Sequence, residues 1–245
     1  MKKRGRIIGE FFLIVVGVLV ALMVETALDE RQDDILRDEY YSRIQADIES
    51  DKRAFNNRTD FFTKVSGFSQ QTLDWLASDL PVDQDSLLAS YYAAEVWPIE
   101  INSSTYQDLN STGNISLLDS IEFRTSLVEY YNKGDAYRPY ISPSDEYRRT
   151  IRGIIPNHIQ TQIGKNCPTT DSLDKVSTGF PPCSLHDIDY DRLTAIFEEL
   201  KGDVDLQRAL SYRISELRVL IYLLARQSIY ADQVLLQIKK QKTRS

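Results

Sequence analysis

The sequence predicts an all-α protein in which an N-terminal transmembrane helix continues into a long stalk helix and an elongated helical bundle. Only 10 glycines and 8 prolines occur in 245 residues, and this scarcity favours long helices over turn-rich sheets. Residues 28–76 contain no proline, and their apolar residues recur at spacings of three, four and seven, the period of one helix face. An apolar stretch, residues 7–24, precedes this helix.

The apolar stretch is predicted to be a membrane anchor. Its 18 residues include one charge, Glu10, and a helix of this length spans about 27 Å, enough to cross the bilayer core. MKKRGR precedes it and the acidic ETALDERQDD follows, so the positive-inside rule places residues 1–6 in the cytoplasm and residues 25–245 outside. A cleaved signal peptide is the alternative, but the stretch is long for one and no small-x-small cleavage site closes it.

Two small residues inside the anchor form a candidate packing face. Gly17 and Ala21 are four positions apart, so they share one side of a helix and would let another backbone approach closely. Small residues are also frequent in membrane helices in general, so chance is the alternative explanation.

Shorter helices are expected after the break at Asp79-Leu80-Pro81. Gly113 is placed to end one of them in a left-handed conformation, and Ser116 with Asp119 resembles a capping box that starts the next. The expected helices span residues 87–96, 105–112, about 116–131, 144–163 with an interruption near Pro156, and 191–200.

The final helix, residues 204–240, is the only other one as long as the first, so the two are expected to pack lengthwise. Its apolar stripe runs from Leu206 to Val234, opposite a stripe on the first helix at Ile44, Ile48, Phe55 and Phe62. Exposure of such a stripe costs about 25 cal/mol per Å². An antiparallel pair returns the basic end of the chain toward the acidic residues 29–39. The basic residues are Lys239, Lys240, Lys242 and Arg244.

The two cysteines, Cys167 and Cys183, flank a loop at residues 164–185 that is rich in Pro, Ser, Thr and Asp. Outside the cytoplasmic membrane thiols are oxidised, so a disulfide that closes this loop is expected, with a stabilisation of about 3 kcal/mol. The alternatives are a free buried pair and a metal site that recruits His186 with Asp187 or Asp189. No tight C-x-x-C pair supports the metal site.

The sequence predicts no catalytic residue, cofactor or metal ion, and hence no enzyme. It has two histidines, His158 and His186, and it lacks the G-x-S-x-G, phosphate-loop, H-E-x-x-H and EF-hand motifs. A hydrolase that uses carboxylates alone is a third alternative, which requires a cleft with two strongly perturbed carboxyl groups. Residues 25–245 carry a net charge of −10, so nucleic acid is not an expected partner.

Two segments carry a resemblance to a known family. They are IGEFFLIVVGVLVAL at residues 8–22 and TYQDLNSTGNISLL at residues 105–118, with Arg124, Leu127, Tyr130 and Tyr131 at helical distance beyond. Together they resemble an uncharacterised bacterial family of single-span membrane proteins, catalogued only as a domain of unknown function. The family's usual Asn-rich, Trp-containing segment is replaced here by VETALDER, which retains only Glu30-Arg31. The resemblance implies an inner-membrane protein of a Gram-negative bacterium with a periplasmic helical body, and it implies no activity.

The leading functional expectation is a non-enzymatic, membrane-anchored periplasmic helical module that acts as an interaction or accessory protein in the cell envelope. Its expected partners are the lipid bilayer and another membrane or periplasmic protein, or a second copy of itself. The alternative is a periplasmic sensory-type domain that binds a small ligand between its helices and signals through a partner, because only six residues precede the anchor.

Overall fold

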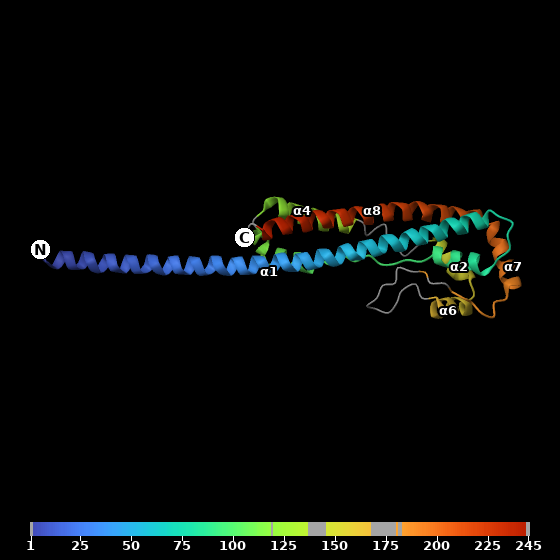
Figure 1. The fold of residues 1–245 in the computed structure, drawn as a ribbon, viewed down its shortest axis with the longest axis horizontal. Coiled ribbons are helices and arrows are strands. Elements are labelled where there is room, and N and C mark those ends of the chain that lie inside the picture. The colour runs from blue at the N-terminus through green and yellow to red at the C-terminus, as the bar shows by residue number, and fades with distance from the viewer. Residues whose placement is uncertain (1, 119, 137–145, 168–179, 181–182, 244–245) are drawn as a thin grey trace.

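The computed structural model describes residues 2–118, 120–136, 146–167, 180 and 183–243, and its regular elements there are all helices. Two long helices form the spine, and shorter ones pack along it (Figure 1). The all-α prediction is confirmed. In chain order the elements are α1 (Lys2–Leu76), α2 (Gln84–Ala93), α3 (Ser104–Thr112), the 3₁₀ helix η1 (Asn114–Leu117), α4 (Ile121–Ala136), α5 (Glu146–Ile154), α6 (Asn157–Asn166), α7 (Tyr190–Lys201) and α8 (Val204–Lys242).

The two long helices run antiparallel, as predicted. Side-chain contacts fix the register: Lys52 Nζ lies 2.6 Å from Asp232 Oδ1, and Ser228 Oγ lies 2.9 Å from Asn56 Oδ1. The C-terminal end of α8 therefore returns alongside the middle of α1 (Figure 1). The two predicted apolar stripes meet in this contact, because Ile44, Ile48, Phe55 and Phe62 share a core with Val234 and neighbouring residues of α8.

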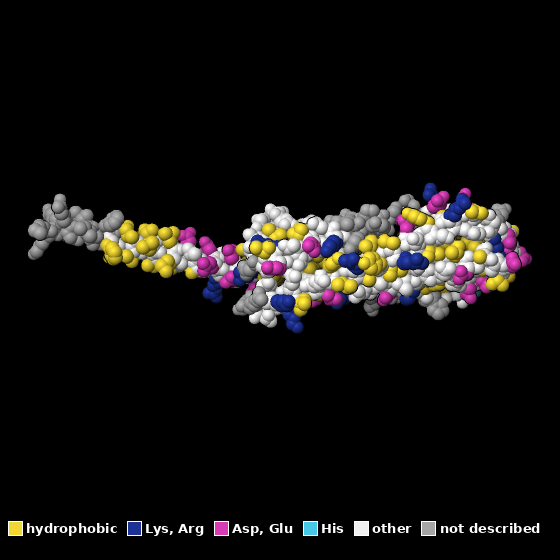
Figure 2. All heavy atoms as spheres, turned by 90° about the horizontal axis from the view of Figure 1, so that it is seen from above, with side chains coloured by type: hydrophobic (Ala, Val, Ile, Leu, Met, Phe, Trp, Pro, Cys, Tyr) yellow, Lys and Arg dark blue, Asp and Glu magenta, His cyan; other side chains and the backbone are white. Residues whose placement is uncertain are grey.

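The N-terminal third of α1 stands apart from the helical body. The helix is continuous over 75 residues, about 110 Å at 1.5 Å per residue. From Phe12 onward, where side chains are described, the first buried ones are Tyr40 and Tyr41. From Phe12 to Val24 the side chains are apolar and exposed. In Figure 2 this segment is a hydrophobic stretch of the helix, separated from the body by a short charged stretch. The predicted stalk is therefore a bare extension of a body helix.

The core is divided along the spine into two clusters. The distal cluster gathers the end of α1, the helices α2, α5, α6 and α7, and the start of α8. The proximal cluster gathers the middle of α1, the helices α3 and α4, and the rest of α8. Phe180 packs against both clusters, with its ring 5.4 Å from that of Phe61 and 4.8 Å from that of Tyr92. Phe180, which lies between the two cysteines in sequence, therefore contacts both parts of the core.

Three local predictions need correction, and one is confirmed. The helix expected from Ser116 begins at Ile121, because the N–H of Phe123 donates to Ser120 Oγ and residues 114–117 form η1 instead; Asp119 lies outside the described residues. The loop expected to start at residue 164 starts after Asn166. The basic end of α8 stops short of the acidic residues 29–39, because Lys242 lies beside Ser42 and Gln45 and donates to these neutral side chains; Arg244 lies outside the described residues. Gly113 does end α3, with a φ of 77°.

The antiparallel contact gives a direct test of the fold. Leu224 of α8 is 2% exposed in the proximal core, so Leu224→Ala is expected to destabilise the protein by about 2–5 kcal/mol through lost burial and the cavity left behind. Leu80, which is 63% exposed, supplies the control, since Leu80→Ala is expected to change stability by less than about 0.5 kcal/mol. Urea denaturation followed by circular dichroism measures both; equal effects would contradict the packing of α8.

Candidate functional site

The predicted packing residues of the anchor lie on the bare part of α1. Nothing lies within 4 Å of the position where a Cβ on Gly17 would stand, and the Ala21 side chain is exposed. The structure thus leaves this face open, and its use as a docking face stays a prediction.

The predicted cysteine pair is brought together. The Cα atoms of Cys167 and Cys183 are 5.2 Å apart with the sulfurs at disulfide distance, inside the range of about 4.4–6.8 Å that a disulfide requires. Residues 168–179 and 181–182 of the enclosed loop lie outside the described part. Gln84 of α2 holds the loop's end, donating to the carbonyl of Cys183 and accepting from the N–H of Leu185, each at 2.9 Å.

The residues of the alternative metal site are used for local structure. His186 is exposed, and its backbone exchanges two hydrogen bonds with the Gln162 side chain at 3.0 and 3.1 Å. Asp189 caps α7 by accepting from the N–H of Arg192. Among the described residues, no group of three or more His, Cys, Asp and Glu side chains is arranged to hold a metal ion.

A buried carboxyl group lies at the centre of the proximal core. Asp51 is 3% exposed and projects from α1 toward α4 and the connector before α3. It accepts hydrogen bonds from the Tyr130 hydroxyl and the Asn102 N–H, each at 2.9 Å. The Asn102 side chain in turn donates to Asp47 at 2.7 Å. We call this group, Asp47, Asp51, Asn102 and Tyr130, the Asp51 cluster.

Burial dominates the protonation chemistry of the Asp51 cluster. Desolvation raises the pKa of Asp51 to about 6, the negative charge of Asp47 adds to this, and the two donated hydrogen bonds oppose it. The pKa of Tyr130 is also raised, by burial and then by the adjacent Asp51. Both groups of the hydrogen bond between Tyr130 and Asp51 are therefore held toward their protonated forms.

A second polar group closes the C-terminal end of α2. The buried Arg213 of α8 donates to the carbonyls of Ala93 at 2.5 Å and Glu95 at 2.7 Å, and Arg148 of α5 donates to the carbonyl of Ala94. Arg152 pairs with the Glu95 carboxylate at 2.5 Å. Cations at this end satisfy the free carbonyls and complement the helix dipole. Burial raises the pKa of Glu95, and the nearby cations oppose that shift.

The described residues give no support for a hydrolase that uses only carboxylates. The two carboxyl groups with raised pKa, Asp51 and Glu95, have separate sets of hydrogen-bonding partners. Asp51 is 3% exposed and is hydrogen-bonded to Asn102 and Tyr130, whereas Glu95 pairs with Arg152. Neither carboxyl group lines the hollow between α4 and α8 described below.

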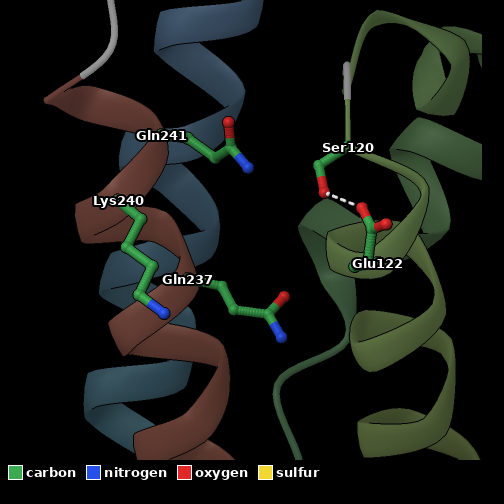
Figure 3. Close-up of a pocket in the computed structure, with 5 residues that line it drawn as sticks. All are labelled: Ser120, Glu122, Gln237, Lys240 and Gln241. Atoms are coloured by element: carbon green, nitrogen blue, oxygen red, sulfur yellow. Dashed lines mark hydrogen bonds between the residues drawn. The ribbon is translucent and has the colours of Figure 1, made fainter.

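A small hollow lies between the start of α4 and the end of α8. Its volume is about 340 Å³, and the described residues that line it are polar or charged: Ser120, Glu122, Gln237, Lys240 and Gln241. Figure 3 shows the two glutamines extending across the gap toward Ser120 and Glu122, whose side chains are hydrogen-bonded to each other at 2.8 Å. Sites for small ligands are lined mainly by apolar and aromatic side chains, so this hollow has the size of such a site without its chemistry.

The sequence interpretation missed both polar clusters, although a signal was present. Asp51 occupies the buried stripe of α1, three residues after Ile48 and four before Phe55, and Arg213 adjoins Ile214 in the stripe of α8. A charged residue at a position of the apolar period indicates either a helix break or a buried, satisfied charge. Here both helices continue, so both charges are buried with partners.

Comparison with known proteins gives no match. No family model matches the chain, and no curated protein or solved structure matches it. The resemblance of residues 8–22 and 105–118 to a family of single-span membrane proteins therefore stays a prediction.

Two helices in the described part of the chain are long and apolar enough to cross a membrane. The best window of the segment Phe12–Leu76 has a mean hydropathy of 2.3 and is 0% buried, whereas that of Val204–Lys242 has a mean hydropathy of 1.2 and is 33% buried. The apolar residues of α8 belong largely to the core, as in a core helix of a soluble domain. Those of α1 from Phe12 to Val24 are all exposed.

The Asp51 cluster predicts an unusual dependence of stability on pH. Because the folded pKa of about 6 exceeds the unfolded value of 3.8, the folded protein retains a proton that the unfolded chain has released, and stability falls as pH rises through this window. Asp51→Asn removes the ionisation, so its stability relative to the natural protein is expected to improve by about 1 kcal/mol between pH 5 and pH 8. Urea denaturation at both pH values measures the difference.

The control for this measurement is Asp60→Asn, which removes an exposed carboxylate from the same helix. Its stability difference from the natural protein is expected to stay nearly constant over the same range. A constant difference for Asp51→Asn as well would show that Asp51 is ionised in the folded protein at pH 5.

Proposed function

We propose that the protein is a membrane-anchored helical module of the bacterial cell envelope, with the N-terminal side of its anchor in the cytoplasm and a periplasmic body that binds other envelope proteins without catalysis. The observation that carries the proposal is the apolar segment of α1, which extends from the body with its side chains uncovered. In water, this segment would be a large exposed apolar surface, of the kind that marks a site of membrane or protein contact.

The proposed orientation is supported by charge and by cysteine chemistry. Four basic residues precede the apolar segment and acidic residues follow it, the distribution expected when the N-terminus faces the cytoplasm. The pairing of Cys167 with Cys183 is compatible with an oxidising compartment for the body. The family resemblance of residues 8–22 and 105–118 agrees with a bacterial inner membrane and a periplasmic body.

An interaction role is favoured by the kinds of site that the body presents. Its buried charges are engaged in holding helices together, as Asp51 and Arg213 illustrate, and its hollow between α4 and α8 is polar. The outer face of α8, by contrast, carries uncovered large apolar side chains. Surfaces of that kind suit protein contacts better than chemistry.

The anchor can be tested by placing charges in its apolar segment. Val16→Arg with Leu19→Arg puts two cations near the centre of the proposed span, where each costs at least about 2.5 kcal/mol. We expect the natural protein to stay in the membrane fraction after carbonate extraction and the double variant to lose stable insertion. Gln71→Arg, at an exposed position of the same helix, is the control and should behave as the natural protein. Natural protein in the soluble fraction would contradict the anchor.

The partner role can be tested by chemical crosslinking in intact cells, followed by mass spectrometry of the purified full-length protein. We expect reproducible crosslinks from the exposed surface of the body to at least one envelope protein, which includes a second copy of the chain. Recovery of the protein only as an uncrosslinked monomer in the membrane fraction would leave the anchor intact and contradict the interaction role.

A further inference from the structure

The helix α8 carries a second apolar stripe on its outer face. Five large side chains are exposed there by 41–66%: Tyr212, Val219, Tyr222, Ile229 and Leu236. Their spacings of seven, three, seven and seven are those of a heptad repeat, with Tyr212 and Val219 at position a and the other three at position d. The repeat extends over the 25 residues from Tyr212 to Leu236, about 36 Å of helix. We call these five residues the α8 outer seam.

The α8 outer seam is distinct from the face that packs on α1. Each seam residue lies two positions from a core residue, as Tyr222 does from Leu224 and Ile229 from Ala231, and two positions correspond to a rotation of about 200°. Seen from the α8 side, the body in Figure 2 shows hydrophobic side chains along its length with Lys and Arg between them. The helix is therefore apolar on two nearly opposite faces, and in the described part of the chain only one of them is covered.

The repeat and its area identify the occupant that fits the seam. A heptad stripe packs against another heptad stripe, with a opposite a and d opposite d when two identical helices run parallel. The five side chains are 41–66% exposed. If each whole side chain has an area on the order of 200 Å², as an aromatic one does, their exposed parts amount to about 500 Å² per copy. Two copies thus bury about 1,000 Å², the lower limit for a specific interface.

An interface of this small size is weak by itself, and the proposed membrane anchor would strengthen the association. Chains tethered in one membrane share an orientation, which makes their α8 helices parallel, and tethering raises their effective concentration. We infer that two copies of this protein associate in the membrane through the α8 outer seam, as a parallel two-fold pair. This inference rests on the proposed function for the tether, whereas the seam itself is a property of the body.

Polar residues within the repeat define the register of the pair. Position a is occupied by Arg226 and Gln233 in the two heptads after Val219. In the single chain the Arg226 guanidinium lies at the surface. It donates hydrogen bonds there to the hydroxyls of Tyr222 and Tyr230, at 3.0 and 2.5 Å. A polar residue at an a position selects register and oligomeric state at a cost in stability. The pair is accordingly expected to be reversible.

Cysteine crosslinking of the full-length protein in native membranes tests the pairing. Cys167 and Cys183 are paired with each other, so an introduced thiol is the free one. Ile229→Cys lies at position d, where it faces its counterpart in a parallel pair, and we expect it to form a disulfide-linked dimer under mild oxidation. Ile121→Cys on α4, 68% exposed, is the matched control and is expected to remain monomeric.

A charge substitution supplies the independent readout. Tyr222→Glu with Ile229→Glu is expected to lower the fraction of dimer by about tenfold or more, as measured with an amine-reactive crosslinker. Ile121→Glu with Leu80→Glu adds the same charge at two other exposed apolar positions and is expected to leave the dimer unchanged. All four side chains are exposed, and circular dichroism of each variant checks that the helices are retained.

The outcomes separate failure of the pairing from failure of the proposed function. A membrane-bound protein whose Ile229→Cys variant crosslinks only to a different protein, or to nothing, overturns the self-association and leaves the anchor standing. A dimer that survives the seam charges but is lost in Gly17→Ile with Ala21→Ile places the contact in the anchor and also overturns it. Natural protein in the soluble fraction contradicts the anchor instead.

Discussion

The antiparallel contact between α1 and α8 is the constraint on which the other helices depend. Neither long helix could expose its apolar stripe in water, and no shorter helix is long enough to cover one. Once the two are paired, the remaining helices only have to cover the apolar residues that the pair leaves exposed along its sides. The helices α2, α5, α6 and α7 do so at the distal end, and α3 and α4 do so at the proximal end. Phe180, from the segment between the two cysteines, also packs on this pair of layers, because its ring contacts aromatic residues of both α1 and α2.

Buried charges give this simple packing its specificity. A purely apolar seam between two long helices tolerates a shift by one heptad, since the stripes would still meet. A shift here would remove Arg213 from the carbonyls at the end of α2 and leave a charge buried without partners. Gln227 of α8, whose side chain donates to the carbonyl of Tyr130 at 2.9 Å, links α8 to α4 in the same way. The ionised Asp51 costs stability at neutral pH, and its hydrogen bonds define how α1, α4 and the connector between α2 and α3 meet.

The parts of this fold that follow from sequence are those set by local periodicity. The long helices and their mutual orientation could be predicted, because apolar stripes of matching length have few ways to be covered, and the cysteine pair could be predicted from its position around one loop. The Asp51 cluster could not, because its partners Asn102 and Tyr130 are 51 and 79 residues away along the chain, and only the tertiary structure brings them together. The start of α4 was misplaced because Ser116 and Ser120 are both credible caps, and the competition is decided by η1. The α8 outer seam was overlooked because its residues alternate along the helix with those of the core.

The continuity of α1 fixes the rotational phase between the apolar segment and the body. Ala21 and Ile48 are 27 residues apart, which is about seven and a half turns at 3.6 residues per turn. Their side chains therefore leave the helix in opposite directions. Since Ile48 faces the proximal core, the side of α1 that carries Ala21 and Gly17 points away from the direction of that core. In a continuous helix, an insertion rotates everything before it relative to the body. Two residues added between Ala21 and the body would rotate the face with Gly17 and Ala21 by about 200°, whereas seven would return that face to within about 20° of its original direction.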